Sequence, residues 1–138
     1  MSKFKFGLDH LGFAVAEFDG GGEFYKALGL NENSREEVTS EKVKTSFFPL
    51  GNRVNIELLE GTNPESPIAK YLDKRGPGIH HICLRVQHLD ELVAQLKEKN
   101  VQLINEVPKD GAHHCRVVFI HPKATGGVLI ELSEKKGS

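Results

Sequence analysis

Six runs of apolar residues, continuous or alternating with polar positions, predict β-strands along the chain. Each run is rich in Val, Ile, Leu or Phe, the residues that suit a half-buried or fully buried strand. Apolar residues recur at helical spacing in Glu23–Leu28, where Gly29 marks the end of the predicted helix, and in Leu89–Asn100. A shorter helix is predicted at Pro67–Lys74. The predicted strands are Leu8–Ala16, Lys44–Leu50, Val54–Leu59, Ile79–Val86, Arg116–Ile120 and Val128–Leu132.

The start of the first helix is the least regular part of this pattern. Asp19 is in a position to cap the helix, but Gly20, Gly21 and Gly22 follow it. Because each glycine costs about 1 kcal/mol in a helix interior, this helix is expected to start late or to fray. The stretch Glu60–Pro67, rich in Pro, Gly, Asn and Ser, predicts a connection between two halves of the chain.

Those two halves resemble each other in sequence. The motif DHLGFAV at Asp9–Val15 matches HHICLRV at His80–Val86, and VNIELLE at Val54–Glu60 matches VLIELSE at Val128–Glu134. In each half the order is a strand, a helix and then further strands. The sequence therefore predicts one domain over residues 1–138, with a first module at 1–61, a connection at 62–77 and a second module at 78–138.

The repeat places one histidine and one glutamate at equivalent positions in each half. His10 aligns with His81 and Glu57 with Glu131, at spacings of 71 and 74 residues. Adjacent residues on a strand face opposite sides, so His80 and His81 cannot both point to the same face. The alignment selects His81.

These four residues form a candidate metal site. A carboxylate inside an apolar strand must be neutralised or coordinated, because an unpaired charge loses its hydration on burial. Two imidazoles and two carboxylates form a nitrogen and oxygen ligand set with a charge of −2, which matches a divalent ion. In the alternative interpretation, the histidines are structural and the glutamates face solvent. That interpretation is reasonable for any one of the four residues, but it does not explain why all four stand at repeat-equivalent positions.

Composition excludes several other classes of protein. The net charge is −1 and the basic residues are scattered, so there is no stripe of the kind that nucleic acids require. No apolar run approaches the roughly 18 residues that span a bilayer, and the N-terminus lacks the apolar core of a secretion signal, which predicts a cytoplasmic protein. Cys83 and Cys115 lie in strand-like runs and are expected to be reduced, buried thiols.

Longer motifs carry a resemblance to a known family. DHLGFAV, SPIAKYLDKRGPGIHHICLRV and FIHPKATGGVLIELSE, together spanning most of Asp9–Glu134, resemble the vicinal oxygen chelate (glyoxalase/bleomycin resistance) superfamily and, within it, the methylmalonyl-CoA epimerases. The resemblance implies an α+β fold of two βαβββ modules in tandem that form a curled mixed sheet around a metal site. It also implies interconversion of (2R)- and (2S)-methylmalonyl-CoA through a metal-stabilised enediolate.

The same resemblance implies a ligand set and partners. His10, Glu57, His81 and Glu131 are similar to the family's metal ligands, although some members carry Gln at the position of Glu57. Cobalt is favoured by the resemblance, while Mn, Ni, Zn and Mg accept the same donors. A CoA thioester is the implied substrate and a homodimer the implied assembly.

Two acid/base residues are expected for epimerisation. By resemblance the general base falls at Glu41, in a loop that departs from the usual local pattern, so Glu36 and Glu37 stay open if the loop register slips. Glu131 is the candidate for the second acid/base, and His113 is the other residue to consider.

Two rival functions stay open at this point. One is a glyoxalase I-like metal-dependent lyase, which the wording of the segment SPIAKYLDKRGPGIHH disfavours. The other is a non-catalytic protein of the same fold that binds a small molecule, against which the four ligand candidates and Glu41 argue. Lys109, Lys123 and Arg116 are available to bind the acidic CoA moiety, but lysines on loops are commonly solubilising residues, and none of the three is assigned.

Overall fold

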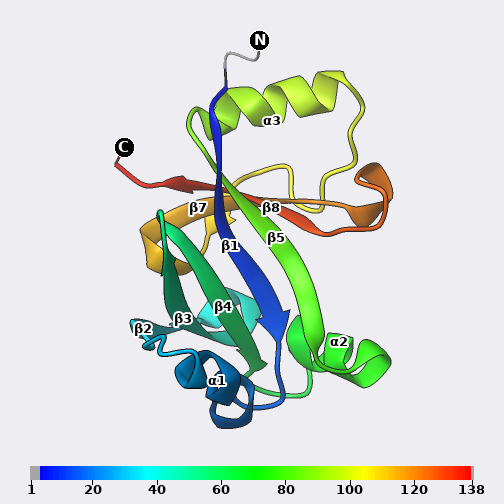
Figure 1. The fold of residues 1–138 in the computed structure, drawn as a ribbon. Coiled ribbons are helices and arrows are strands. Elements are labelled where there is room, and N and C mark those ends of the chain that lie inside the picture. The colour runs from blue at the N-terminus through cyan, green and yellow to red at the C-terminus, as the bar shows by residue number, and fades with distance from the viewer. Residues whose placement is uncertain (1–3, 138) are drawn as a thin grey trace. The chain divides into compact units, whose positions relative to one another are not determined.

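A computed structural model describes residues 4–137 of the chain (Figure 1). Three α-helices and eight strands lie within those residues, in the order strand, helix, three strands, taken twice, with one helix in between. This confirms the α+β class and the two successive βαβββ modules. The helices are α1 (Phe18–Ala27), α2 (Pro67–Arg75) and α3 (Leu89–Glu98). The strands are β1 (Phe6–Ala14), β2 (Ser34–Val38), β3 (Val43–Gly51), β4 (Val54–Gly61), β5 (Gly78–Val86), β6 (Lys109–Asp110), β7 (Cys115–Ile120) and β8 (Ile130–Lys135), with short 3-10 turns η1 (Thr39–Glu41), η2 (Ala112–His114) and η3 (Pro122–Ala124).

The chain divides into two compact units. The first unit is His10–His80, and the second unit joins residues 4–9 to residues 81–137. Strands β1 and β5 each begin in one unit and end in the other.

The first unit is a mixed sheet with a helix on one face. Its strand order is β2-β3-β4-β1, in which β1 runs parallel to β4 and the other neighbours are antiparallel. Helix α1 packs on the face formed by Phe48, Ile56 and Leu58, to which it contributes Phe18. Alternation along β4 puts Glu57 on the opposite face. One end of that opposite face is covered by α2 through Ile68.

The second unit repeats this layout. Its strand order is β5-β8-β7-β6, with β5 parallel to β8 and the other neighbours antiparallel. Helix α3 packs through Leu89 and Leu92 on a face that includes Val118 and Leu132. The alternate residues of β8, Glu131 among them, point to the other face. In each unit one helix therefore covers one face of the sheet and a glutamate lies on the other.

Strand register confirms the alignment of the two halves. In the first unit Gly12 on β1 is the partner of Glu57 on β4, and in the second unit Cys83 on β5 is the partner of Glu131 on β8. In both cases the histidine stands two residues before the partner of the glutamate, on the same face of the strand.

The last glutamate of each repeated motif holds the start of its unit's helix. The Glu60 carboxylate accepts a hydrogen bond from the backbone N–H of Phe18 at 3.0 Å. The Glu134 carboxylate accepts from the backbone N–H groups of His88 at 2.7 Å and Leu89 at 3.4 Å. A carboxylate at a helix N-terminus satisfies donors that have no partner inside the helix and interacts favourably with the helix dipole.

The expectation of a late or frayed first helix, capped by Asp19, was wrong. Helix α1 starts at Phe18, Asp19 lies inside its first turn, and the glycines are part of the helix. The glycines allow close packing: a Cβ built on Gly21 would lie 2.7 Å from Cγ1 of Val15. The helix thus accepts the conformational penalty of glycine because larger residues would hold it away from the sheet.

Replacing Gly21 with alanine is expected to destabilise the protein by about 1–3 kcal/mol, the usual cost of overpacking. Gly20→Ala is the matched control, because its Cβ would meet only the Glu17 side chain at 3.6 Å, an ordinary contact. The control should gain up to about 1 kcal/mol from helix propensity. Urea unfolding of both variants measures the difference, and a stabilised Gly21→Ala would contradict the packing argument.

Several strand boundaries differ from the prediction. Strands β2 and β6 were not predicted, because SREEV has no apolar alternation and β6 is only two residues long. Strand β1 spans Phe6–Ala14, two residues earlier than predicted.

Both cysteines are free thiols, but only Cys83 is buried. Cys115 is partly exposed, so the expectation of two buried thiols was wrong for it, and the burial that it has raises the pKa of its thiol. None of the helices in residues 4–137 has the length and apolar character to cross a bilayer.

Candidate metal and proton-transfer site

The first unit contains a buried His–Glu pair. His10 Nε2 on β1 lies 3.4 Å from Glu57 Oε2 on β4, and the two residues are 6% and 4% exposed. Neighbouring parallel strands bring the two side chains together on the face that α1 does not cover. A carboxylate with so little exposure requires a hydrogen-bonding, ionic or metal partner.

The second unit contains the equivalent pair. His81 Nε2 on β5 lies 3.0 Å from Glu131 Oε1 on β8, and both residues are buried. The Phe119 ring packs edge-on against the His81 imidazole, with ring centroids 6.3 Å apart. His80 has a different environment, an edge contact at 5.0 Å with the ring of Tyr71 on α2. The structure therefore pairs His81 with Glu131, and not His80.

The geometry of each pair fits two ligands of one divalent ion. Nitrogen and oxygen donors that bind a metal at 2.0–2.2 Å lie about 3–3.5 Å apart in a tetrahedral site. The observed separations of 3.4 Å and 3.0 Å agree with that spacing. Nε2 of histidine and a carboxylate oxygen are also a donor set that first-row divalent metals accept.

The three base candidates of the first unit lie in different positions. Glu36 on β2 is opposite Thr45 and lies on the face of the sheet that carries Glu57. Glu37 is exposed and opposite Lys44, and so lies on the other face. Glu41 ends η1 and is half-buried.

The backbone around Glu41 is held in place. The next residue, Lys42, has a left-handed conformation, with φ 55° and ψ 45°. Its carbonyl accepts a hydrogen bond from the N–H of Thr62 at 3.0 Å, and its N–H donates to the carbonyl of Thr39 at 3.1 Å. A left-handed conformation at a residue other than glycine is sparsely populated and occurs often at functional sites.

His113 occupies the position in the second unit that Glu41 occupies in the first. Each stands in a 3-10 turn, six residues before the phenylalanine that pairs with the unit's buried glutamate, Phe47 in one case and Phe119 in the other. His113 is exposed, and it has a left-handed backbone conformation like that of Lys42, with a φ of 55°. The repeat thus relates the two acid/base candidates as well as the two pairs.

The three basic residues considered for CoA binding also differ. The Arg116 guanidinium makes two hydrogen bonds to Asp90 in the first turn of α3, at 2.8 Å and 3.2 Å, and one of 3.5 Å to Glu134. Its bond to Asp90 lowers the pKa of that carboxyl. Arg116 therefore supports the start of α3. Lys123 is exposed in η3, and Lys109 is half-buried on β6.

Comparison with known proteins places the chain among described enzymes. A family model described as Glyoxalase/Bleomycin resistance protein/Dioxygenase superfamily matches residues 9–119. The mitochondrial methylmalonyl-CoA epimerase of Homo sapiens is 38% identical over 129 residues, which are 92% of this chain and 73% of that protein. The chain therefore belongs to the glyoxalase/bleomycin resistance protein/dioxygenase superfamily.

Solved structures support the same assignment. A methylmalonyl-CoA epimerase from Mycobacterium tuberculosis is 40% identical and superposes with a TM-score of 0.88, covering 94% of this chain and 87% of that one. A variant of the Streptomyces coelicolor methylmalonyl-CoA epimerase, in complex with 2-nitronate-propionyl-CoA, is 31% identical with a TM-score of 0.89 and covers 95% of both chains. Within the superfamily, the family to which the chain belongs is that of the methylmalonyl-CoA epimerases, as its motifs predicted.

Proposed function

We propose that this protein interconverts (2R)- and (2S)-methylmalonyl-CoA, and that its two buried His–Glu pairs together hold one divalent metal ion. The observation that carries the proposal is the presence of such a pair at the same register position in both halves of a chain whose relatives include methylmalonyl-CoA epimerases. The proposed substrate is a CoA thioester and the proposed assembly is a homodimer.

The proposed metal ligands are Nε2 of His10 and His81 and carboxylate oxygens of Glu57 and Glu131. Their two negative charges balance a divalent ion, and cobalt is the proposed metal. When bound, the ion supplies Lewis-acid polarisation of carbonyl and carboxylate oxygens, which is worth several kcal/mol of charge stabilisation. The protein's own part is to keep these donors buried and correctly spaced.

Glu41 is the proposed general base. Carbon 2 of the substrate lies between a thioester carbonyl and a carboxylate, so its proton is weakly acidic and its removal leaves an enediolate-like anion. A carboxylate on a turn with a fixed backbone can be held at one face of that carbon. A positioned base of this kind typically accelerates proton transfer about 10²–10⁴-fold.

Inversion requires a proton from the opposite face. Glu131 is the proposed second acid/base, through an oxygen not fully committed to the metal. His113 is the second candidate, favoured by its position as the counterpart of Glu41. A His113→Asn variant keeps all four proposed metal ligands, so its effect on exchange can be separated from loss of metal.

Exchange of the carbon 2 proton tests the proposed reaction directly. Methylmalonyl-CoA is incubated with the protein in D₂O, with and without added Co²⁺, and both epimers are followed by NMR and mass spectrometry. Metal-dependent uptake of deuterium with interconversion of the epimers is the expected result. Absence of exchange in the metal-loaded protein would reject the epimerase, and turnover of a glutathione hemithioacetal would then identify a glyoxalase-like lyase. If neither reaction occurs, a binding protein is left.

A further inference from the structure

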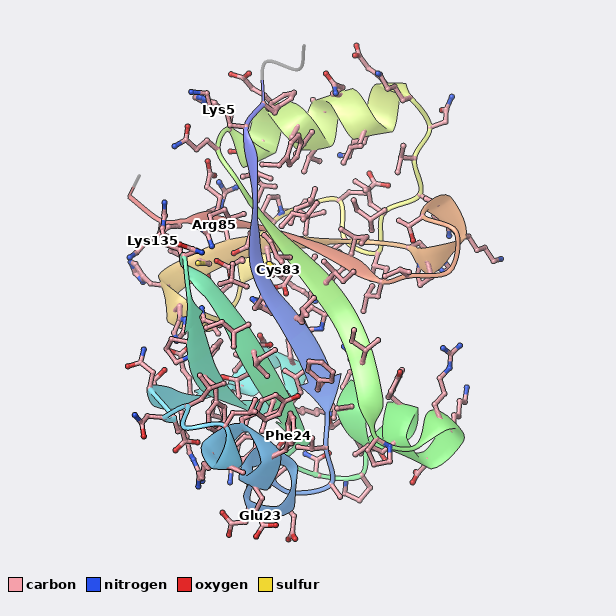
Figure 2. All side chains as sticks on the ribbon, viewed as in Figure 1. Lys5, Glu23, Phe24, Cys83, Arg85 and Lys135 are labelled. Carbon is pink, nitrogen blue, oxygen red and sulfur yellow. The ribbon has the colours of Figure 1, made fainter. Side chains whose placement is uncertain are left out.

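The neighbours of Glu131 in the second unit differ in their exposure to solvent. Its partner on β5 is Cys83, which Figure 2 labels, and its partner on β7 is Phe119. Residues that pair on neighbouring strands share a face of the sheet, and the His81 imidazole contacts the Phe119 ring. Cys83, His81 and Glu131 are buried, whereas Phe119 is only half-buried. The aromatic ring is therefore the most exposed of these four side chains.

The equivalent phenylalanine of the first unit is covered. Phe47 pairs with Glu57 as Phe119 pairs with Glu131, but Phe47 is 2% exposed. The repeat thus supplies the same residue beside both buried pairs, and in the second unit part of its ring is in contact with water. Removing apolar surface from water is favourable, so an apolar group of a bound ligand would be stabilised against this ring.

The Phe119 ring is held in a fixed position. The backbone N–H of Phe119 donates to Oδ1 of Asn105 at 2.8 Å, and its carbonyl accepts from the N–H of Ile104 at 2.8 Å. The ring packs against the imidazole of His81, with centroids 6.3 Å apart, and the Lys109 ammonium lies 5.5 Å from the ring centroid. A side chain packed on several sides does not yield easily to a larger group, so it can discriminate by size.

The proposed substrate has one apolar group next to its reacting carbon, the methyl group on carbon 2. Carbon 2 is bonded to both the thioester carbon and the carboxylate carbon, whose oxygens are polar and suit the end of the site that carries His81 and Glu131. The substituent on carbon 2 is therefore close to the same two residues. We infer that the exposed surface of Phe119 contacts this substituent and limits its size, so that a methyl group is accepted in preference to an ethyl group. The inference rests on the proposed function.

The test compares methylmalonyl-CoA with ethylmalonyl-CoA, which has one more methylene group on carbon 2. The kcat/KM for epimerisation of each is measured in the wild type, in Phe119→Leu and in Phe119→Trp. The ratio of ethylmalonyl-CoA to methylmalonyl-CoA should rise about tenfold or more in Phe119→Leu and fall in Phe119→Trp, because one methylene group in an apolar pocket changes kcat/KM about 10–200-fold. Both substrates are measured on one preparation, so the ratio does not depend on the fraction of protein that is folded or metal-loaded.

Phe24→Leu is the matched control, because it makes the same chemical change at another exposed phenylalanine. Phe24, which Figure 2 labels, is 64% exposed and lies on α1, the helix that packs on the face of the first unit opposite to Glu57. Both kcat/KM values and their ratio should stay at the wild-type level in this variant.

Two outcomes would overturn the inference. One is a ratio that stays at the wild-type value in both Phe119 variants. The other is an equal loss of kcat/KM for both substrates together with an altered visible absorption spectrum of the Co²⁺-loaded protein, which would show that Phe119 orients His81 and does not select the substrate. Failure of the proposed function itself is seen separately, as absence of deuterium exchange from methylmalonyl-CoA in the wild type.

Discussion

Replacing Glu41 with glutamine is expected to lower the rates of epimerisation and of deuterium exchange by about 10²–10⁴-fold. Glutamine keeps the size and hydrogen-bonding capacity of the side chain but cannot accept the carbon 2 proton. Glu41 is not among the proposed metal ligands, so metal content measured by mass spectrometry should stay at the wild-type value. A loss of kcat with intact metal would therefore report on proton transfer itself.

Glu37→Gln is the matched control for this experiment. Glu37 belongs to the same segment and carries the same charge, but it is exposed and lies on the face of β2 away from Glu57. Its replacement should leave turnover within about twofold of wild type, since surface changes away from a site have small effects. If Glu41→Gln keeps full activity, Glu41 is not the general base. Glu36, which lies on the face of the sheet that carries Glu57, is then the next residue to replace.

Removing a single histidine should abolish metal binding. The proposal of one ion held by both pairs predicts one metal per chain in the wild type and close to none in either His10→Ala or His81→Ala. Changing a partner of a metal ligand already weakens binding about 10–100-fold, so loss of a ligand itself is expected to exceed about 100-fold. Epimerisation should fall to background in both variants.

Counting the metal distinguishes one shared ion from two separate ones. If each pair held its own ion, the wild type would contain two per chain and each variant would keep one. His121→Ala is the control, because the His121 imidazole accepts a hydrogen bond from the backbone N–H of Lys123 and lies outside both pairs. Its metal content should equal that of the wild type. Retention of one ion in either pair variant would contradict the shared site.

The sequence alone predicted which residues of the two halves are equivalent. The motifs align His10 with His81 and Glu57 with Glu131, and strand register reproduces that alignment. The alternation of β5 also separates His81 from His80 in the way that the repeat indicated. These features follow from local patterns, since apolar alternation fixes which face a residue occupies.

Features that depend on distant parts of the chain were missed. The start of α1 is set by a hydrogen bond to Glu60, 42 residues further along, and by the closeness of Gly21 to Val15. Local helix propensity depends only on the residues of the helix itself, and its glycines predict a weak helix. The matching glutamates at the ends of the two repeated motifs were visible in the sequence, yet nothing in their spacing indicated that they hold helix N-termini.

The positions of these glutamates also affect how the protein folds while it is being synthesised. A chain synthesised from its N-terminus produces α1 long before Glu60 and α3 long before Glu134, its partner 46 residues after His88. Contacts so distant in sequence form slowly, because a long loop must first close. On the ribosome, each helix therefore emerges with donors at its N-terminus that still face water, and each unit can complete its fold only after its last strand has been made.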